Sequence, residues 1–461
     1  MYLSEIVAGF ARELSYEELP DEVIAAALTA ISDTLGCAVA AVDEPGPRIL
    51  RDYAMRQSGF HGATLLGESA KVDPSLAALV NCSLARDLDA NDLYAGTPGR
   101  DTGHFSDAIP ALLAVAEASG ASGRELITAV VIAYEVQAVL AESYLWMKRG
   151  LHSVSQVTWA LPAAVGRLLG LQQEQIISAI GLAGTTGGLI LQSWLRPSPS
   201  LPLIKGGAPG FAAKQALEST ELARLGFTAP PDALETLFDR LPSEADMSAF
   251  QNLVKPYRFT TARNMLKRYP AQIYTQAAVQ AALAIHPHIE DVDQIAVATV
   301  YGHQNVAAGV QGSAGAYSPT TRGAADHSTP FVVAVGLRDG DLSPQSYEGE
   351  PWREEALLDL MRRVDLVIDP EFQRGFDERG EFGCRLVVEL LDGRRFEETV
   401  RQQRGHPDNP LSREDLLAKM RAFADWKLGA GAAERIHDVV QALPEADRVD
   451  EVVGSCRAVD E

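Results

Sequence analysis

Residues suited to acid–base chemistry gather in one short stretch, between residues 86 and 107. Asp89 and Asp92 lie three apart, so they would share one face if the helix predicted before them continues. His104 follows after a loop rich in glycine and proline, just before the next predicted helix. Acids, an imidazole and free backbone N–H groups in one cleft could move a proton. The alternative is that Ser106 is only a helix cap and that the acids are solvated.

The charge of the chain excludes some partners. Its 461 residues hold 62 acidic and 40 basic side chains, a net charge of −22. Such a surface repels phosphate backbones and anionic membranes, so we expect neither nucleic acid nor a membrane as a partner. The same charge would repel an anionic substrate. An enzyme for such a substrate must therefore gather its cations in one cleft.

The four cysteines and the known short motifs point to no metal or cofactor. Cys37, Cys82, Cys384 and Cys456 are far apart and form no C-x-x-C pair. No phosphate-binding loop, nucleophile elbow or HExxH motif occurs. The amino-terminal segment lacks a basic lead, and no uninterrupted apolar run approaches the roughly 18 residues that span a bilayer. These features predict a reduced, cytoplasmic protein.

Helices must position most of these residues. Apolar side chains recur at i, i+3 and i+4 through residues 1–268, with glycine and proline between the segments. We predict helices over 21–41, 107–118, 125–145, 153–169 and 211–225. The third has the clearest start, because Ser122 and Glu125 form a capping box.

The pattern of apolar residues changes after about residue 268, from helical to a mixture of helix and strand. A helix over 271–285 precedes a strand-like segment, 294–302, and Asp392–Gly393 has the composition of a hairpin turn. Residues 269–401 thus read as a smaller α/β domain, and residues 402–461 as helices that return to the first domain. The predicted fold class is mainly α, with a large all-helical domain plus a smaller α/β domain.

Five blocks in order resemble the MmgE/PrpD family. The first is LDANDLY followed by GHFSDAIPALLAVAEA, at residues 88–118. The others are GLH at 150–152, KGGAPGFAAKQALESTELARLGFTAP at 205–230, MLKRYPAQ at 265–272 and RGAADHSTPF at 322–331. The tail HPDNPLSREDLLAKM also fits. The likeness covers nearly the whole chain.

The resemblance implies a homodimeric lyase for small polycarboxylates that needs no metal. The family includes 2-methylcitrate dehydratase, cis-aconitate decarboxylase and iminodisuccinate epimerase. Carried over position by position, it implies three catalytic residues and five that bind the substrate. The catalytic residues are Asp89, His104 and Lys267; the binding residues are Asp92, His152, Lys205, Gln272 and Tyr317.

Three positions depart from the family pattern. Gln272 stands where decarboxylase-like members carry a histidine, and a neutral amide cannot hold a proton reversibly. Leu93 replaces a hydroxyl residue, and Phe105 replaces a proline. The first departure counts against decarboxylation.

The expected reaction is dehydration of a tricarboxylate such as 2-methylcitrate to 2-methyl-cis-aconitate, a step of propionate catabolism. His104 or Asp89 would remove the proton, and Lys205 and Lys267 would stabilise the negative charge that develops, worth about 3 kcal/mol for each well-placed donor. His327 is expected to be structural, because it lies beside a helix-starting serine. Decarboxylation, epimerisation of an amino or imino dicarboxylate, and a non-enzymatic polycarboxylate-binding or scaffold role are the alternatives.

Overall fold

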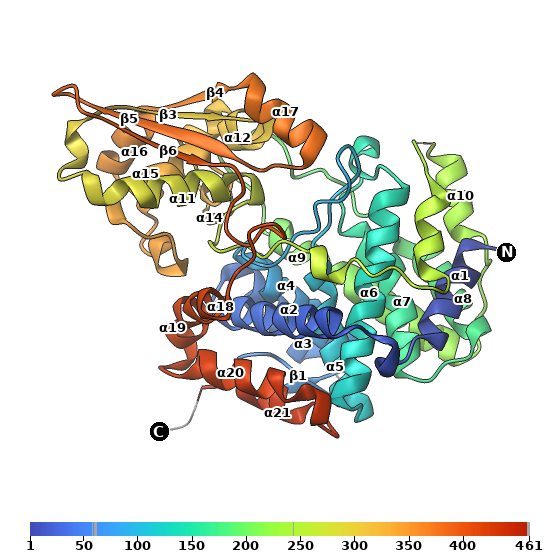
Figure 1. Ribbon diagram of the computed structural model, residues 1–461. Coiled ribbons are helices and arrows are strands. Elements are labelled where there is room, and N and C mark those ends of the chain that lie inside the picture. The colour runs from blue at the N-terminus through green and yellow to red at the C-terminus, as the bar shows by residue number, and fades with distance from the viewer. Residues whose placement is uncertain (58, 60–61, 243, 459–461) are drawn as a thin grey trace.

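The computed structural model describes residues 1–57, 59, 62–242 and 244–458. It confirms the predicted fold class: a large body of helices and a smaller α/β part beside it (Figure 1). One buried apolar core joins the amino-terminal helices to those near the carboxyl terminus, and a second core fills the α/β part.

Within the described residues, ten α-helices build the first part of the helical body, and apolar faces pack them together. Several begin or end at residues with clear local reasons. Ser122 caps α6 in the predicted capping box, and Gly120 ends α5 in the left-handed conformation that glycine adopts without strain. The helices are α1 Leu3–Glu13, α2 Asp21–Ala40, α3 Pro45–Gln57, α4 Pro74–Asp87, α5 Ile109–Ser119, α6 Gly123–Ser143, α7 Ser155–Leu168, α8 Gln173–Gly187, α9 Ile204–Arg224 and α10 Ala233–Arg240.

The carboxyl-terminal helices pack back on this body, the first three against α2 and the last against α5 (Figure 1). They are α18 Arg413–Met420, α19 Trp426–Leu428, α20 Ala432–Gln441 and α21 Asp450–Ser455, with a π-helical turn between α18 and α19. The two strands β1 Ala63–Thr64 and β2 Lys71–Val72 form a small antiparallel ladder at the edge of the body.

The α/β part is built on a four-stranded sheet of order β4-β3-β5-β6. Strands β3 Ile295–Gly302 and β4 Val364–Ile368 run parallel, whereas β5 Cys384–Leu390 is antiparallel to both β3 and β6 Arg395–Val400. The predicted hairpin joins β5 to β6 through Asp392–Gly393. Helices α11 Gln276–Ile285 and α15 Thr329–Asp339 pack against the sheet, and the shorter helices are α12 Gln304–Ala307, α13 Gly309–Gly312, α14 Arg322–Ala325, α16 Glu355–Arg362 and α17 Pro370–Arg379.

Two local predictions were wrong. Helix α4 ends at Asp87, so Asp89 and Asp92 do not share a helical face. The reason is the backbone of Asp89, which has a φ of +50° and cannot continue a right-handed helix. Helix α9 begins at Ile204 rather than near Phe211, because it tolerates Pro209 in its second turn.

In the part of the chain that the structure describes, two helices, α2 and α6, are long and apolar enough to cross a membrane by length and composition alone. The relevant windows of these helices are 78% and 94% buried inside the protein. Their apolar character therefore fits helices that form the centre of the core.

Candidate active site

Asp89 lies where the helical body meets the α/β part. Its carboxylate pairs with the ammonium group of Lys267 through Oδ1, and Oδ2 lies 3.3 Å from Nζ of Lys205. Lys267 also donates a hydrogen bond of 2.9 Å to the main-chain carbonyl of Asp89. The left-handed turn at Asp89 thus presents one carboxylate to two lysines from distant parts of the chain.

The α/β part supplies a second carboxylate and a histidine. Lys205, in the first turn of α9, lies 3.0 Å from Oδ2 of Asp326, which follows α14. His327 bridges the two acids: Nε2 lies 3.4 Å from Oδ2 of Asp89, and Nδ1 meets Oδ1 of Asp326. Arg322 lies 3.5 Å from Asp326 on the far side. The site is therefore assembled across the seam between the two parts.

This cluster is buried and rich in cations. Lys267 exposes only 1% of its surface, and Asp89, Asp326 and Lys205 are buried as well. Two lysines and Arg322 gather around Asp89 and Asp326, and Arg322 also lies 3.9 Å from Glu44, so three cations are concentrated here within a chain of net charge −22. Burial alone would raise the pKa of Asp89, but the charges of Lys205, Lys267 and His327 hold it well below its usual range. Asp89 thus stays ionised, and the cluster can receive an anion.

His104 is held as a neutral base. It lies directly before the short 3₁₀ turn Phe105–Ala108, and its Nδ1 is 2.5 Å from the carbonyl oxygen of Asp92. A carbonyl only accepts, so Nδ1 must carry the proton and Nε2 keeps its lone pair. Burial, and then the charges of Arg86 and Lys267, lower the pKa of His104 well below its usual value. The imidazole is therefore ready to accept a proton through Nε2.

His152 is held in the opposite tautomer. Its Nδ1 accepts a hydrogen bond of 3.2 Å from the backbone N–H of Val154, so the proton of the neutral ring lies on Nε2. Burial lowers the pKa of His152 to about 3. The charge of Arg86 lowers this pKa further and the charge of Asp89 raises it, as both do for His104. The ring packs on Trp194, with centroids 5.0 Å apart. His152 can therefore donate a proton where His104 can accept one.

Asp92 is occupied by the protein itself. Oδ1 accepts hydrogen bonds from the hydroxyl of Ser106 at 2.6 Å and its backbone N–H at 3.1 Å, and Oδ2 accepts one from Tyr134 at 2.8 Å. Burial raises the pKa of Asp92 to about 6, against the effect of these hydrogen bonds. A neighbouring pair, Arg86 and Asp107, is buried at 2.9 Å. The carboxylate of Asp92 thus anchors the start of the helix after His104.

Gln272 and Tyr317 lie outside this set of contacts. The side-chain oxygen of Gln272 accepts a hydrogen bond of 2.7 Å from the backbone N–H of Tyr274, and the backbone N–H of Gln272 donates to the carbonyl of Asp326 at 2.9 Å. The hydroxyl of Tyr317 donates to the carbonyl of Val364 at the start of β4, 2.8 Å away. Gln272 thus supports the backbone of Asp326, and Tyr317 is tied to the sheet.

Sequence reasoning missed Asp326, His327 and Arg322. His327 was interpreted as a structural residue, and Ser328 does cap α15 as that interpretation required. The signal that could have found them is the adjacency of an acid and a histidine within the block at residues 322–331.

Three of these side chains could in principle hold a metal ion. One ligand atom each from Asp89, Asp326 and His327 lies within 4.8 Å of the other two. Nζ of Lys205 already lies between the two carboxylates, at 3.3 and 3.0 Å. A cation would have to displace that ammonium group, so the donor set suits an anion better than a metal.

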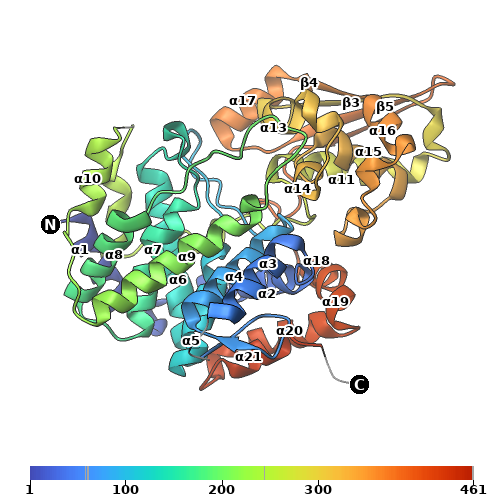
Figure 2. The same cartoon turned by 180° about the vertical axis from the view of Figure 1, so that it is seen from behind.

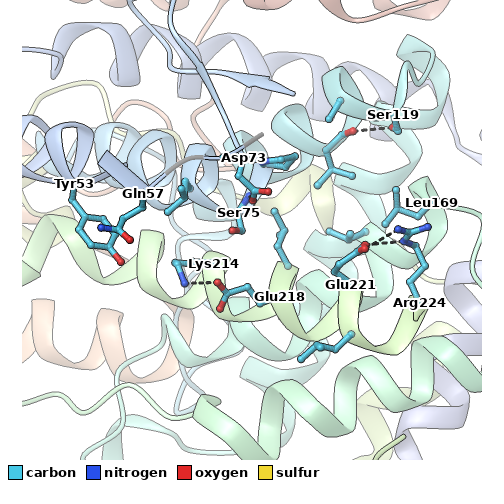
Figure 3. A pocket seen from close by; sticks show the side chains of 18 residues that line it. Tyr53, Gln57, Asp73, Ser75, Ser119, Leu169, Lys214, Glu218, Glu221 and Arg224 are labelled. Atoms are coloured by element: carbon cyan, nitrogen blue, oxygen red, sulfur yellow. Dashed lines mark hydrogen bonds and ion pairs between the residues drawn. The ribbon is translucent and has the colours of Figure 1, made fainter. Parts of the chain in front are cut away.

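Two cavities bear on where a ligand could bind. One, of about 360 Å³, lies at the seam and is lined by Lys205, Arg322, Asp87 and Tyr347 among others. A larger one, of about 960 Å³, lies against α3, α4 and α9 (Figure 3); Figure 2 shows the arrangement of these three helices. None of the residues of the Asp89 cluster described above lines the larger cavity.

Comparison with known proteins assigns the chain to a family. The MmgE/PrpD N-terminal domain matches residues 5–239, and the MmgE/PrpD C-terminal domain matches residues 269–445. The chain belongs to the MmgE/PrpD family. This confirms the resemblance found in the sequence.

Curated relatives carry the names of two reactions. The 2-methylcitrate dehydratase of Escherichia coli is 26% identical over 393 residues, which is 80% of this chain and 78% of the relative. That of Cupriavidus necator is 28% identical over 395 residues, with the same coverage of 80% and 78%. The human cis-aconitate decarboxylase is 26% identical over 472 residues, covering 97% of this chain and 93% of the relative. The names support an enzyme of the lyase type.

Proposed function

We propose that this chain is a hydro-lyase that removes water from a small tricarboxylate such as 2-methylcitrate, giving 2-methyl-cis-aconitate. The observation that carries the proposal is the pair of neutral histidines in opposite tautomers, His104 and His152, beside a buried cationic cluster. The names of the dehydratase relatives support the reaction type.

Elimination needs a base and an acid at once, and the two histidines are suited to these roles. Nε2 of His104 takes the proton from the carbon next to a carboxylate, and the electron pair forms the new C=C bond. The C–O bond on the neighbouring carbon breaks, and Nε2–H of His152 delivers the proton that lets the hydroxyl leave as water, which leaves His104 as an imidazolium and His152 as an imidazolate. Proton exchange with solvent then restores both rings. Asp89 is the weaker candidate for the base, because both of its carboxylate oxygens are already held by lysine ammonium groups.

The two lysines act on charge. A proton next to a carboxylate is weakly acidic, so its removal must be accompanied by stabilisation of the negative charge that builds on that carboxylate. Lys205 and Lys267 are buried and held in place by Asp89, so their ammonium groups have fixed positions to which a substrate carboxylate would bind by sharing them with Asp89. We propose that these ammonium groups supply the stabilisation that a metal ion supplies in other hydratases.

Epimerisation is the second candidate, because it begins with the same removal of a proton next to a carboxylate as dehydration does, but no group leaves. Decarboxylation is less favoured, since the side-chain oxygen of Gln272 is engaged with the backbone of Tyr274 and an amide does not transfer protons. A tricarboxylate-binding protein without turnover is the non-enzymatic alternative.

The test is turnover of 2-methylcitrate, citrate and cis-aconitate with EDTA present, followed by ultraviolet absorbance of the conjugated product and by mass spectrometry. We expect 2-methylcitrate to give an alkene and Lys205→Met to lose the activity. Lys427→Met is the control, because Lys427, in α19, pairs with the exposed Asp43 at 2.9 Å, away from the proposed site. Thermal stabilisation by the substrate without turnover would indicate a binding protein. The absence of both turnover and stabilisation would refute the proposal.

We also propose that the protein is cytoplasmic and forms a homodimer through the face around α3 and α9. Tyr53, Met55, Phe211 and Leu222 are large apolar side chains that stay exposed there. The charges on α9 pair within the chain, Lys214 with Glu218 and Arg224 with Glu221 (Figure 3). Two copies could meet on this face without the repulsion that the net charge of −22 would otherwise cause.

A further inference from the structure

Lys419 is a buried lysine that the proposed reaction does not use. It lies near the end of α18, after the chain has left the α/β part, and exposes only 1% of its surface. Its ammonium group donates to the main-chain carbonyl of Ala90 at 2.7 Å and to Oδ1 of Asp33 on α2 at 2.6 Å. Ala90 directly follows Asp89.

The turn that Lys419 reaches is the one that aims Asp89. Asp89 adopts a φ of +50°, which a residue other than glycine holds only where its surroundings enforce it. Two successive carbonyls of this turn each receive an ammonium group: that of Asp89 from Lys267 and that of Ala90 from Lys419. Charged donors make strong hydrogen bonds in a buried setting, so they fix the plane of each peptide.

We propose that Lys419 is a positioning residue, which holds the Asp89–Ala90 turn so that the carboxylate of Asp89 meets Lys205 and Lys267. The inference rests on the proposed function only where turnover is the readout. It gives the carboxyl-terminal helices a role in the site, because Lys419 reaches the Asp89–Ala90 turn from α18.

The competing explanation is a structural ion pair that joins α18 to α2, with the contact to Ala90 incidental. Three variants separate the two explanations. Lys419→Met removes both contacts, whereas Asp33→Asn removes the charge of the partner and keeps the donor to Ala90. The double variant Asp33→Leu/Lys419→Met removes the pair without leaving a buried charge alone, which limits the loss of global stability. Lys427→Met, whose ammonium group pairs with the exposed Asp43 at 2.9 Å, is the control for a lysine at the surface.

Hydrogen exchange of the peptide over residues 88–94 is the readout that does not depend on a substrate. The amides of Asp89 and Leu93 are hydrogen-bonded to the carbonyls of Arg86 and Met265. We expect Lys419→Met and the double variant to exchange at least about tenfold faster there, because a hydrogen bond from a charged donor is lost. Asp33→Asn and Lys427→Met should keep the exchange rate of the parent protein.

Turnover gives the second readout. With 2-methylcitrate we expect kcat of the double variant to fall between about tenfold and a hundredfold. KM should change by less than about threefold, because Lys205 and Lys267 remain. Parental exchange and kcat in the double variant, or losses in Asp33→Asn equal to those in Lys419→Met, would overturn the proposal. If the parent protein turns over no tricarboxylate, the proposed function fails, and exchange at residues 88–94 still decides the role of Lys419.

Discussion

Replacing Lys267 by methionine tests the centre of the site most directly. Methionine keeps the length and apolar stem of the side chain but removes the ammonium group that meets the carboxylate and carbonyl of Asp89. Breaking a buried ion pair costs about 3–5 kcal/mol, because one charge is left without its partner. Asp89 keeps Lys205 at 3.3 Å and His327 at 3.4 Å, so we expect the lower end, about 3 kcal/mol.

A double-mutant cycle with Asp89→Asn isolates the pair. Asparagine suits the cycle because it tolerates the left-handed backbone of residue 89 and cannot carry the charge. We expect the free energy of unfolding, measured by urea denaturation near pH 7, to give a coupling energy of about 2–3 kcal/mol. Lys214→Met should cost about 1 kcal/mol or less, because its partner Glu218 is half-exposed.

The pH dependence gives an independent check with a defined sign. A carboxyl group whose pKa is depressed by folding adds stability above its unfolded pKa and loses it as the pH falls through the folded pKa. In Lys267→Met we expect the pKa of Asp89 to rise, so Asp89 takes up a proton at a higher pH than in the parent protein. The loss of stability of the variant relative to the parent protein should therefore become smaller on acidification from pH 7. Additive single variants, or a destabilisation independent of pH, would refute the ion pair as the organising contact.

Three further predictions concern other parts of the fold. Burial, and then Glu44, raise the pKa of Asp87 to about 7, so this group lowers stability progressively as the pH rises from its unfolded pKa through about 7. Asp87→Asn should therefore add roughly 1–2 kcal/mol to the free energy of unfolding at about pH 8 but little at about pH 4 or below, as urea denaturation would detect. A Cβ on Gly405 would lie 1.8 Å from the carbonyl oxygen of the residue before Lys267, so Gly405→Ala should lower both kcat and the melting temperature. Gly429→Ala is the control, because Gly429 also has a positive φ but a Cβ there would have no neighbour within 4 Å. Equal effects in the two variants would contradict this prediction. Phe211→Glu should convert a dimer to a monomer in light scattering, and a monomeric parent protein would count against the proposed interface.

The fold was accessible from the sequence because its signals are local. The capping box at Ser122, the glycine that ends α5 and the turn at Asp392–Gly393 each act within a few residues, and each predicted element formed. The start of α9 was missed because proline is usually a boundary, whereas the packing of α9 against α4 and α8 outweighs the hydrogen bond lost at Pro209.

The candidate site was accessible only in part, since its geometry depends on contacts between distant segments. The resemblance to the family already predicts Asp89, Lys205 and Lys267 as site residues, and these three are in contact. Asp326 and His327 join them only because the α/β part packs on the helical body. Nothing within ten residues of His327 in the sequence indicates that Asp89 will lie 3.4 Å away.

The division of roles between the histidines is a property of the fold rather than of residue type. His104 and His152 have the same side chain, and burial lowers the pKa of each. One Nδ1 faces a carbonyl and must donate, while the other faces a backbone N–H and must accept. A single peptide group beside each ring therefore decides which histidine can act as the base and which as the acid. Exchanging the two roles would require moving the backbone at Asp92 or Val154, so we expect substitutions that shift those peptides to impair turnover while both histidines remain in place.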